Sequence, residues 1–188
     1  NAGSETKVTN AEASGDVETN GESEEAEGDR VGGAIGYLQD DAEITDSNAT
    51  GDVIGKDSVG GLIGLTGFDP ATLVETCFAE GAVTSTEKDG FASVGGLIGE
   101  NQGEVLDSYA TGDVTGQSGG SRGDYVGGLI GENYGDIRRC SAAGNVEGQD
   151  TVGGLVGSNE LVDGSMLDGV IKNCYATGQV QAAETSED

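Results

Sequence analysis

The sequence predicts an all-β fold, a parallel β-solenoid of about six coils. Three observations lead to this fold class. Two short segments alternate along the 188 residues, one reading Val-Gly-Gly-apolar-apolar-Gly and the other running from Val or Ile to Gly-x-Val. Starts of the second segment are separated by 36, 30, 31, 32 and 34 residues, a period typical of solenoids, propellers and arrays. Aromatic residues make up only 4% of the chain, which excludes a core of large side chains.

The repeat units favour strands over helices. They are rich in Gly, Val, Ile and Thr, and each interior Gly would cost a helix about 1 kcal/mol relative to Ala. Propeller blades need about 40–50 residues each, more than one unit provides. Short strands bounded by Gly turns, one coil per unit and coils about 4.8 Å apart, are therefore expected.

Both halves of the repeat occur several times. The first half-unit is found at 31–36, 59–64, 94–99, 126–131 and 152–157, and the second at 8–17, 44–53, 74–83, 105–114, 137–146 and 171–180. Because one unit is too small to bury its own apolar face, neighbouring units must stack. We expect a single domain over 1–188, with units at approximately 8–30, 31–58, 59–93, 94–125, 126–151 and 152–180.

The second half-unit can be read by counting residues after its opening Val or Ile. Position three holds Ala, Ser or Cys, position five Ala, position seven Gly and position nine Val. Alternation with a period of two places these positions on one face, inward, and their small size predicts a narrow coil. The opening residue is out of phase, so a bend is expected near position two, which holds Asn10, Asp46, Asp107 and Asn173. Whether Leu62 or Ile63 points inward stays open.

These segments resemble a known repeat. VGGLIGENYGDIRRCSAAGNV (126–146) and VGGLVG (152–157) with IKNCYATGQV (171–180) are similar to the GLUG repeat, and the similarity covers about residues 8–180. The resemblance implies a right-handed β-helix in bacterial and archaeal surface proteins, including adhesin-like proteins and regions beside immunoglobulin-cleaving metallopeptidases. The chain has no His and no HExxH motif, so nothing of the peptidase carries over.

Charge narrows the set of partners. Asp and Glu total 35 against 8 Lys and Arg, a formal net charge of -27. Such a surface repels nucleic acid and anionic membranes, and no apolar run of about 18 residues predicts membrane insertion. We expect an extracellular or cell-surface protein of high-salt surroundings, without a cofactor, whose acidic surface is screened by Ca²⁺ or other cations. The start at Asn1 suggests a processed chain or an excised fragment.

Catalysis has little support in the sequence. Without His, a Ser-His-Asp or Cys-His arrangement is impossible, and 35 carboxylates guarantee chance pairs. We therefore expect no enzyme. Among the possible functions, an enzyme acting on polysaccharides is a distant third, after the two non-enzymatic ones given below. It would need a basic residue among paired carboxylates. Arg138 and Arg139, expected at turn positions, are the one adjacent basic pair.

Three candidate sites lie on outward positions. Position eight places Asp16, Asp52 and Asp113 outward, where stacked carboxylates offer a weak metal site against a background of diffuse screening. Position four holds Asn48, in the sequon Asn-Ala-Thr, as a possible glycosylation site. The same position holds Phe78, Tyr109 and Tyr175, which suggests a lateral contact or cover by a loop. Any other ligand is expected at the variable loops between half-units, such as 20–29, 115–125 and 158–169.

The cysteines share one column, at position three. Cys140 and Cys174 fall on consecutive coils, close enough for a disulfide, whereas stacked parallel Cβ vectors favour a ladder of buried small residues with Cys77. Both alternatives stay open.

The ends of the array suggest its function. The first and last units lack an obvious cap, which predicts either a longer array or head-to-tail stacking through Val8, Val17, Ile171 and Val180. The hypothesis is a non-enzymatic subunit of a cell-surface filament that polymerises with itself. The alternative is an adhesin fragment that binds glycans or proteins of a host or neighbouring cell.

Overall fold

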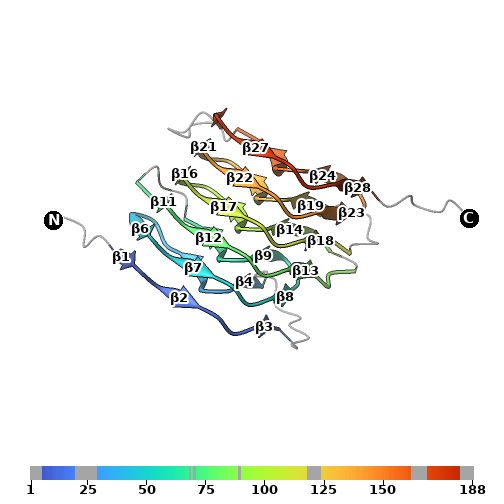
Figure 1. Ribbon diagram of the computed structural model, residues 1–188, viewed down its shortest axis with the longest axis horizontal. Coiled ribbons are helices and arrows are strands. Elements are labelled where there is room, and N and C mark those ends of the chain that lie inside the picture. The colour runs from blue at the N-terminus through green and yellow to red at the C-terminus, as the bar shows by residue number, and fades with distance from the viewer. Residues whose placement is uncertain are drawn as a thin grey trace, which may run out of the picture.

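Short parallel strands stack into five sheets in the computed structural model, which describes residues 6–19, 29–67, 69, 71–88, 90–117, 124–161 and 169–182. The chain runs through one strand of each sheet in turn and then begins the next coil above the last (Figure 1). Five complete coils and three strands of a sixth are formed. The predicted parallel β-solenoid is confirmed, whereas its right-handedness stays a prediction.

Three sheets are built by the second half-unit, and we call them sheets A, B and C. Sheet A contains β1 (Thr6–Thr9), β6 (Ala42–Thr45), β11 (Leu73–Glu75), β16 (Glu104–Leu106), β21 (Asp136–Arg138) and β26 (Ile171–Lys172). Sheet B contains β2 (Glu12–Ala13), β7 (Asn48–Ala49), β12 (Phe78–Ala79), β17 (Tyr109–Ala110), β22 (Ser141–Ala142) and β27 (Tyr175–Ala176). Sheet C contains β3 (Val17–Glu18), β8 (Val53–Gly55), β13 (Val83–Ser85), β18 (Val114–Thr115), β23 (Val146–Gly148) and β28 (Val180–Ala182).

The first half-unit builds the other two sheets, D and E. Sheet D contains β4 (Arg30–Gly32), β9 (Ser58–Gly60), β14 (Ala92–Gly95), β19 (Asp124–Gly127) and β24 (Thr151–Gly153). Sheet E contains β5 (Ile35–Leu38), β10 (Ile63–Thr66), β15 (Ile98–Asn101), β20 (Ile130–Asn133) and β25 (Val156–Asn159). Equivalent residues of the repeats pair in register, as in Val94 with Val126 and Ile98 with Ile130.

The core fills two strips along the solenoid axis. One strip is almost entirely valine from sheets C and D, and the other combines Ile, Leu, Val, Ala and Cys from sheets A, B and E. Positions three, five, seven and nine of the second half-unit are buried in the inner coils, as predicted. The opening residue is buried as well, for example Ile44 and Val74 at 0% exposure.

At the corner between sheets D and E, both residues of the apolar pair, Leu62 and Ile63, are buried. Leu62 lies in the turn and Ile63 begins β10, and both are 0% exposed because the chain reverses between them. The glycine before them allows this corner to pack closely. A Cβ atom on Gly61 would lie 2.2 Å from the carbonyl oxygen of Gly96 and 2.8 Å from Cβ of Ala79. The invariant Ala at position five and this Gly therefore face each other across a narrow interior.

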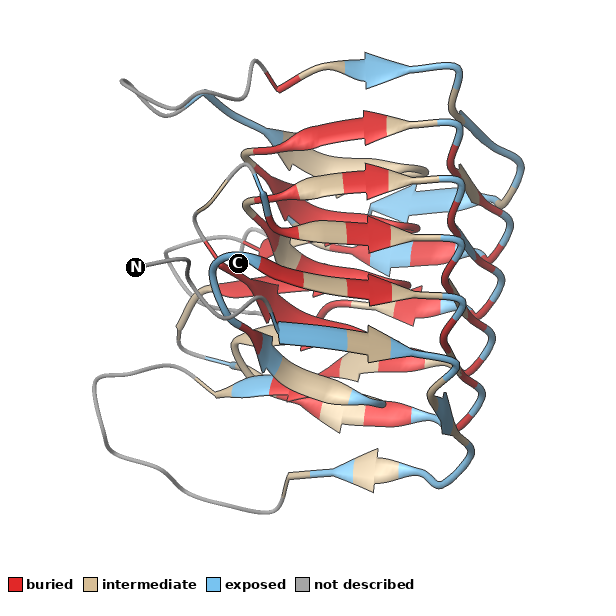
Figure 2. Ribbon diagram, turned by 90° about the vertical axis from the view of Figure 1, so that its left-hand side faces the viewer, coloured by how far each residue is buried: buried red, intermediate tan, exposed pale blue. Residues whose placement is uncertain are grey.

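Burial follows position in the stack. Buried residues concentrate in the inner coils, whereas the strands at both ends of the stack are mostly half-buried or exposed, with Val31 and Leu38 of the first coil as buried exceptions (Figure 2). No helix able to cross a membrane occurs in the described part of the chain.

Candidate functional site

The corner between sheets A and B is a left-handed residue in every coil. The predicted bend at Asn10, Asp46, Asp107 and Asn173 is confirmed by φ values of 53°, 51°, 47° and 57°. Thr76 and Arg139 adopt the same conformation, with φ of 55° and 56°, although neither residue type favours it. The stacked neighbours therefore impose the corner even where the residue does not prefer it.

The side chain after each corner closes it with hydrogen bonds. The Ser47 hydroxyl donates to the carbonyl oxygen of Thr45 over 2.8 Å and accepts from the amide of Ala11 on the previous coil over 3.0 Å. Ser108 repeats this pattern with Leu106 and Cys77, at 2.7 and 3.0 Å. In the second to sixth coils, position three therefore holds Ser or Cys, small side chains that can both donate and accept a hydrogen bond, whereas the first coil has Ala11 there.

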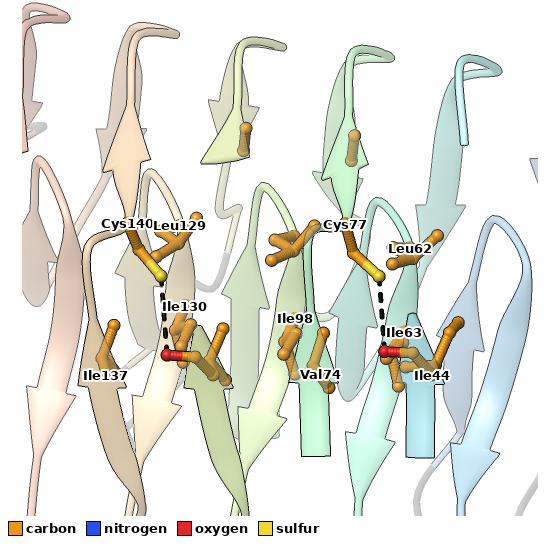
Figure 3. Close-up of a cluster of buried hydrophobic side chains, with 14 of the residues drawn as sticks. Ile44, Leu62, Ile63, Val74, Cys77, Ile98, Leu129, Ile130, Ile137 and Cys140 are labelled. Atoms are coloured by element: carbon orange, nitrogen blue, oxygen red, sulfur yellow. Dashed lines mark hydrogen bonds between the residues drawn. The ribbon is translucent and has the colours of Figure 1, made fainter. Parts of the chain in front are cut away.

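All three cysteines are free thiols in this structure. The Sγ atoms of Cys77 and Cys140 point into the core and donate to the carbonyl oxygens of Ile44 and Val105, at 3.6 Å in each case (Figure 3). Burial raises the pKa of Cys77 to about 11 and that of Cys140 to about 12. Cys174 Sγ accepts from the amide of Cys140 at 3.3 Å, as a serine would. The arrangement is that of the buried ladder.

The predicted metal residues lie on the outward column before sheet C. The Asp16 carboxylate accepts from the amide of Asp52 at 3.0 Å, and Asp52 accepts from the amide of Ala82 at 2.8 Å. Asp113 is two coils from Asp52, with Ala82 between them, so the three carboxylates do not converge. Across the described residues, no group of three or more His, Cys, Asp or Glu is arranged to hold a metal ion. The structure assigns these carboxylates a role as caps between coils.

The outward column of sheet B holds the predicted lateral contact. The rings of Phe78 and Tyr109 stack with centroids 5.0 Å apart and planes 2° apart. Tyr175 is separated from them by Ser141 and is 64% exposed. Asn48 pairs with Phe78 in register and is half-buried beside this stack. The sequon and the lateral contact stay predictions.

The adjacent arginines are held in ion pairs. Arg138 lies at the end of β21 rather than in a turn, and its guanidinium contacts Glu104 and Asp136. Arg139 occupies the corner and pairs with Asp107 through two hydrogen bonds of 2.7 and 2.6 Å. The Arg139 guanidinium holds the pKa of Asp107 below its usual value. Both arginines therefore serve cross-coil contacts on sheet A.

An asparagine ladder inside sheet E was not predicted from the sequence. Asn101 Nδ2 donates to Asn133 Oδ1 at 2.8 Å, and Asn133 Nδ2 donates to Asn159 Oδ1 at 2.7 Å. Thr66 extends the ladder by donating to Asn101 at 3.1 Å. The sequence does contain a pattern that indicates this ladder, because Asn follows the first half-unit at the same position in three successive repeats.

A second unpredicted cluster lies on the outer side of sheets D and E. Glu132 is 5% exposed and accepts hydrogen bonds from Tyr134 and from Ser93, the latter at 3.1 Å. Burial raises the pKa of Glu132, and the carboxylates of Glu100 and Glu160 add to the rise. Burial also raises the pKa of Glu100, its register partner. Glu100 and Glu132 thus form an acidic column that is partly buried and carries raised pKa values.

The stacked sheets and their internal ladders define a β-solenoid repeat protein. The family described as "The GLUG motif" matches residues 28–54, 92–115, 123–147 and 148–181, together more than half of the sequence. The chain belongs to the GLUG motif family.

One relative in sequence and one solved structure of similar fold match the chain. Halomucin from Haloquadratum walsbyi is 39% identical over 116 residues, which cover 60% of this chain and 1% of Halomucin. The chain therefore spans only a small part of that relative. A crystal structure from Bacteroides ovatus, named as a candidate immunoglobulin A1 protease, superposes with a TM-score of 0.53. It is 17% identical, with 94% of this chain and 67% of that chain covered, so the likeness concerns the fold.

Proposed function

We propose that the chain is a non-catalytic structural module of an extracellular surface protein, which extends into a filament by stacking coil on coil. The observation that carries this proposal is the exposure of the last coil. Ile171 and Val180 are 40% and 49% exposed. Their register partners one coil earlier, Ile137 and Val146, are 0% and 1% exposed. A further coil would return both side chains to the interior.

The proposed occupant of this end is the first coil of a second copy. Val8 and Val17 stand in the same columns as Ile171 and Val180 and are half-buried. Stacking would continue the parallel register and pair the free edges of β26, β27 and β28. Such a head-to-tail contact does not close on itself, so it propagates into a filament.

Charge at the two ends supports this contact. The described residues 169–182 of the last coil include Lys172 and no Asp or Glu. Residues 6–19 of the first coil include Lys7 and three acidic residues, Glu12, Asp16 and Glu18. In a chain of net charge -27, a junction between the acidic first coil and residues 169–182, the described part of the last coil, carries less repulsion than one between two acidic coils.

The extracellular setting rests on the family and on composition. The name Halomucin points to a mucin of a halophile, in agreement with an acidic surface that needs screening by cations. The second candidate function is a ligand-binding adhesin module, for which sheet C offers a groove.

Sedimentation velocity of the chain over a range of protein and salt concentrations tests the filament. We expect self-association that grows with concentration and with salt. Val180→Asp should abolish it, because a carboxylate would be buried at the junction. Thr111→Asp, which adds the same charge to an exposed position of an inner coil, should leave it unchanged. A wild-type chain that stays monomeric throughout would refute the proposal.

A further inference from the structure

A polar groove of about 260 Å³ opens on the outer side of sheet C, over the last three coils. One wall is the outward column before the sheet, formed by Asp113, Asn145 and Gln179. The other wall is formed by Thr115, Glu147 and Gln181, which point outward from β18, β23 and β28. The two columns stand two residues apart on the same outward face, so a ligand in the groove lies along both of them.

The first wall is held in place by the solenoid itself. The Asn145 amide donates to Asp113 Oδ1 at 2.8 Å, and the Gln179 amide donates to Asn145 Oδ1 at 3.1 Å. One side-chain oxygen of Asp113 and that of Asn145 are therefore fixed by the next coil. The other carboxylate oxygen of Asp113 and the Nδ2 group of Asn145 stay available to a ligand. Fixed polar groups lose little conformational freedom on binding, which favours affinity.

We propose that this groove binds a neutral saccharide chain. Its walls combine carboxylate acceptors with amide and hydroxyl groups, a set that matches the alternating donors and acceptors of sugar hydroxyls. Asp113 and Glu147 repel an anionic ligand, and the polar walls offer little to an apolar one. Consecutive coils lie about 4.8 Å apart, comparable to the length of one sugar residue in an extended chain, so successive sugars meet successive coils.

The groove is a local feature rather than a property of every coil. The equivalent positions one coil earlier are Ala82 and Thr84, and two coils earlier they are Asp52 and Ile54. Side-chain amides enter the walls only in the last two coils. The site is complete within one chain, so the inference goes beyond the structural role and does not depend on end-to-end stacking. It also places the ligand on a sheet, whereas the sequence favoured the variable loops.

Chemical-shift mapping of the ¹⁵N-labelled chain tests the site. The probes are cellohexaose, mannohexaose and chitohexaose, with hexagalacturonate as the anionic counterpart. We expect at least one neutral probe to bind with a dissociation constant on the order of 1 mM or tighter and to shift the amides of Asp113, Asn145 and Gln179. Hexagalacturonate should cause no such shifts. Absence of groove shifts with all three neutral probes, or equal binding of the anionic one, overturns the proposal.

Two variants link binding to the groove. The double change Gln179→Ala with Gln181→Ala should weaken binding at least about tenfold. Thr115→Ala should weaken it about threefold, whereas Thr84→Ala, the same change one coil outside the groove, should leave it unchanged. The threonine pair keeps the test valid if the double variant unfolds. Unchanged affinity in Thr115→Ala and in a folded double variant contradicts the assignment.

Discussion

Asn101 donates a hydrogen bond from Nδ2 to Oδ1 of Asn133 over 2.8 Å, which joins two consecutive coils through the interior of sheet E. Both residues are 0% exposed. Each Nδ2 also donates to a carbonyl oxygen two residues ahead, that of Gly103 or Gly135. The ladder therefore satisfies polar groups that water cannot reach, and it makes the stability of each coil depend on its neighbours.

Replacing the middle of this ladder should be costly. Asn133→Ala removes bonds to Asn101, Asn159 and Gly135 and leaves buried partners unsatisfied, so we expect a loss of about 3 kcal/mol in unfolding free energy. Asn159→Ala, the same change at the exposed end of the ladder, should cost about 1 kcal/mol. Urea denaturation measures both. Equal losses would show that the ladder is not cooperative.

The narrow interior predicts opposite responses at two glycines. Gly61→Ala forces a Cβ atom against Gly96 and Ala79 and should destabilise the chain by about 3 kcal/mol or more. Gly15→Ala meets no atom within 4 Å and should be neutral, or stabilising by about 0.5 kcal/mol. Thermal denaturation compares the two. A tolerated Gly61→Ala would mean that the coil can widen, contrary to the packing described above.

The buried acidic column predicts a specific pH dependence. The pKa of Glu132 is raised in the folded state, so the folded chain binds this proton more tightly than the unfolded chain. The contribution of Glu132 to the free energy of unfolding therefore increases as the pH falls from 7 through the raised pKa toward about 4.3, the ordinary pKa of Glu. Relative to Glu132→Gln, the wild-type chain should therefore gain stability on acidification.

Urea denaturation at several pH values measures this difference. Glu80→Gln, which removes a carboxylate from an exposed position of an inner coil, serves as the control and should show a much smaller trend. A wild-type chain that loses stability relative to Glu132→Gln as the pH falls would contradict the expected direction of the effect.

The cysteine column predicts graded thiol reactivity. Burial protects Cys77 and Cys140 and raises the pKa of both thiols, so neither should react with iodoacetamide near pH 8 while the chain is folded. Cys174 is only half-buried and should react first. Mass spectrometry after timed alkylation measures the order in which the three thiols react. Failure to label Cys174 in the native chain, with recovery after reduction, would instead reveal the Cys140–Cys174 disulfide.

Much of the fold could be predicted because the same residue pattern recurs in every repeat unit. Small residues at positions three, five and seven predicted a narrow coil, and short polar residues predicted the corner. The corner at Thr76 and Arg139 could not be predicted from residue type, because the coils on either side impose it. The reversal after Gly61 could not be predicted either. It buries both Leu62 and Ile63, whereas strict alternation would bury only one of two adjacent residues.

The candidate sites were harder to predict than the fold. Outward Asp residues at position eight suggested metal ligands, but the capping of the next coil by Asp16 and Asp52 depends on backbone amides, which composition does not reveal. The groove of sheet C is lined by position eight and by the residue two places after it, which a period of two places on the same outward face. The sequence does not show that a hollow forms over these columns in the last three coils.

The proposed filament requires the end coils of this module to stack on one another. Electron microscopy of the wild-type chain in high and low salt tests it most directly. End-to-end stacking predicts filaments with an axial repeat of about 25–30 Å, the height of five to six coils about 4.8 Å apart. Dispersed particles at every salt and protein concentration would contradict it.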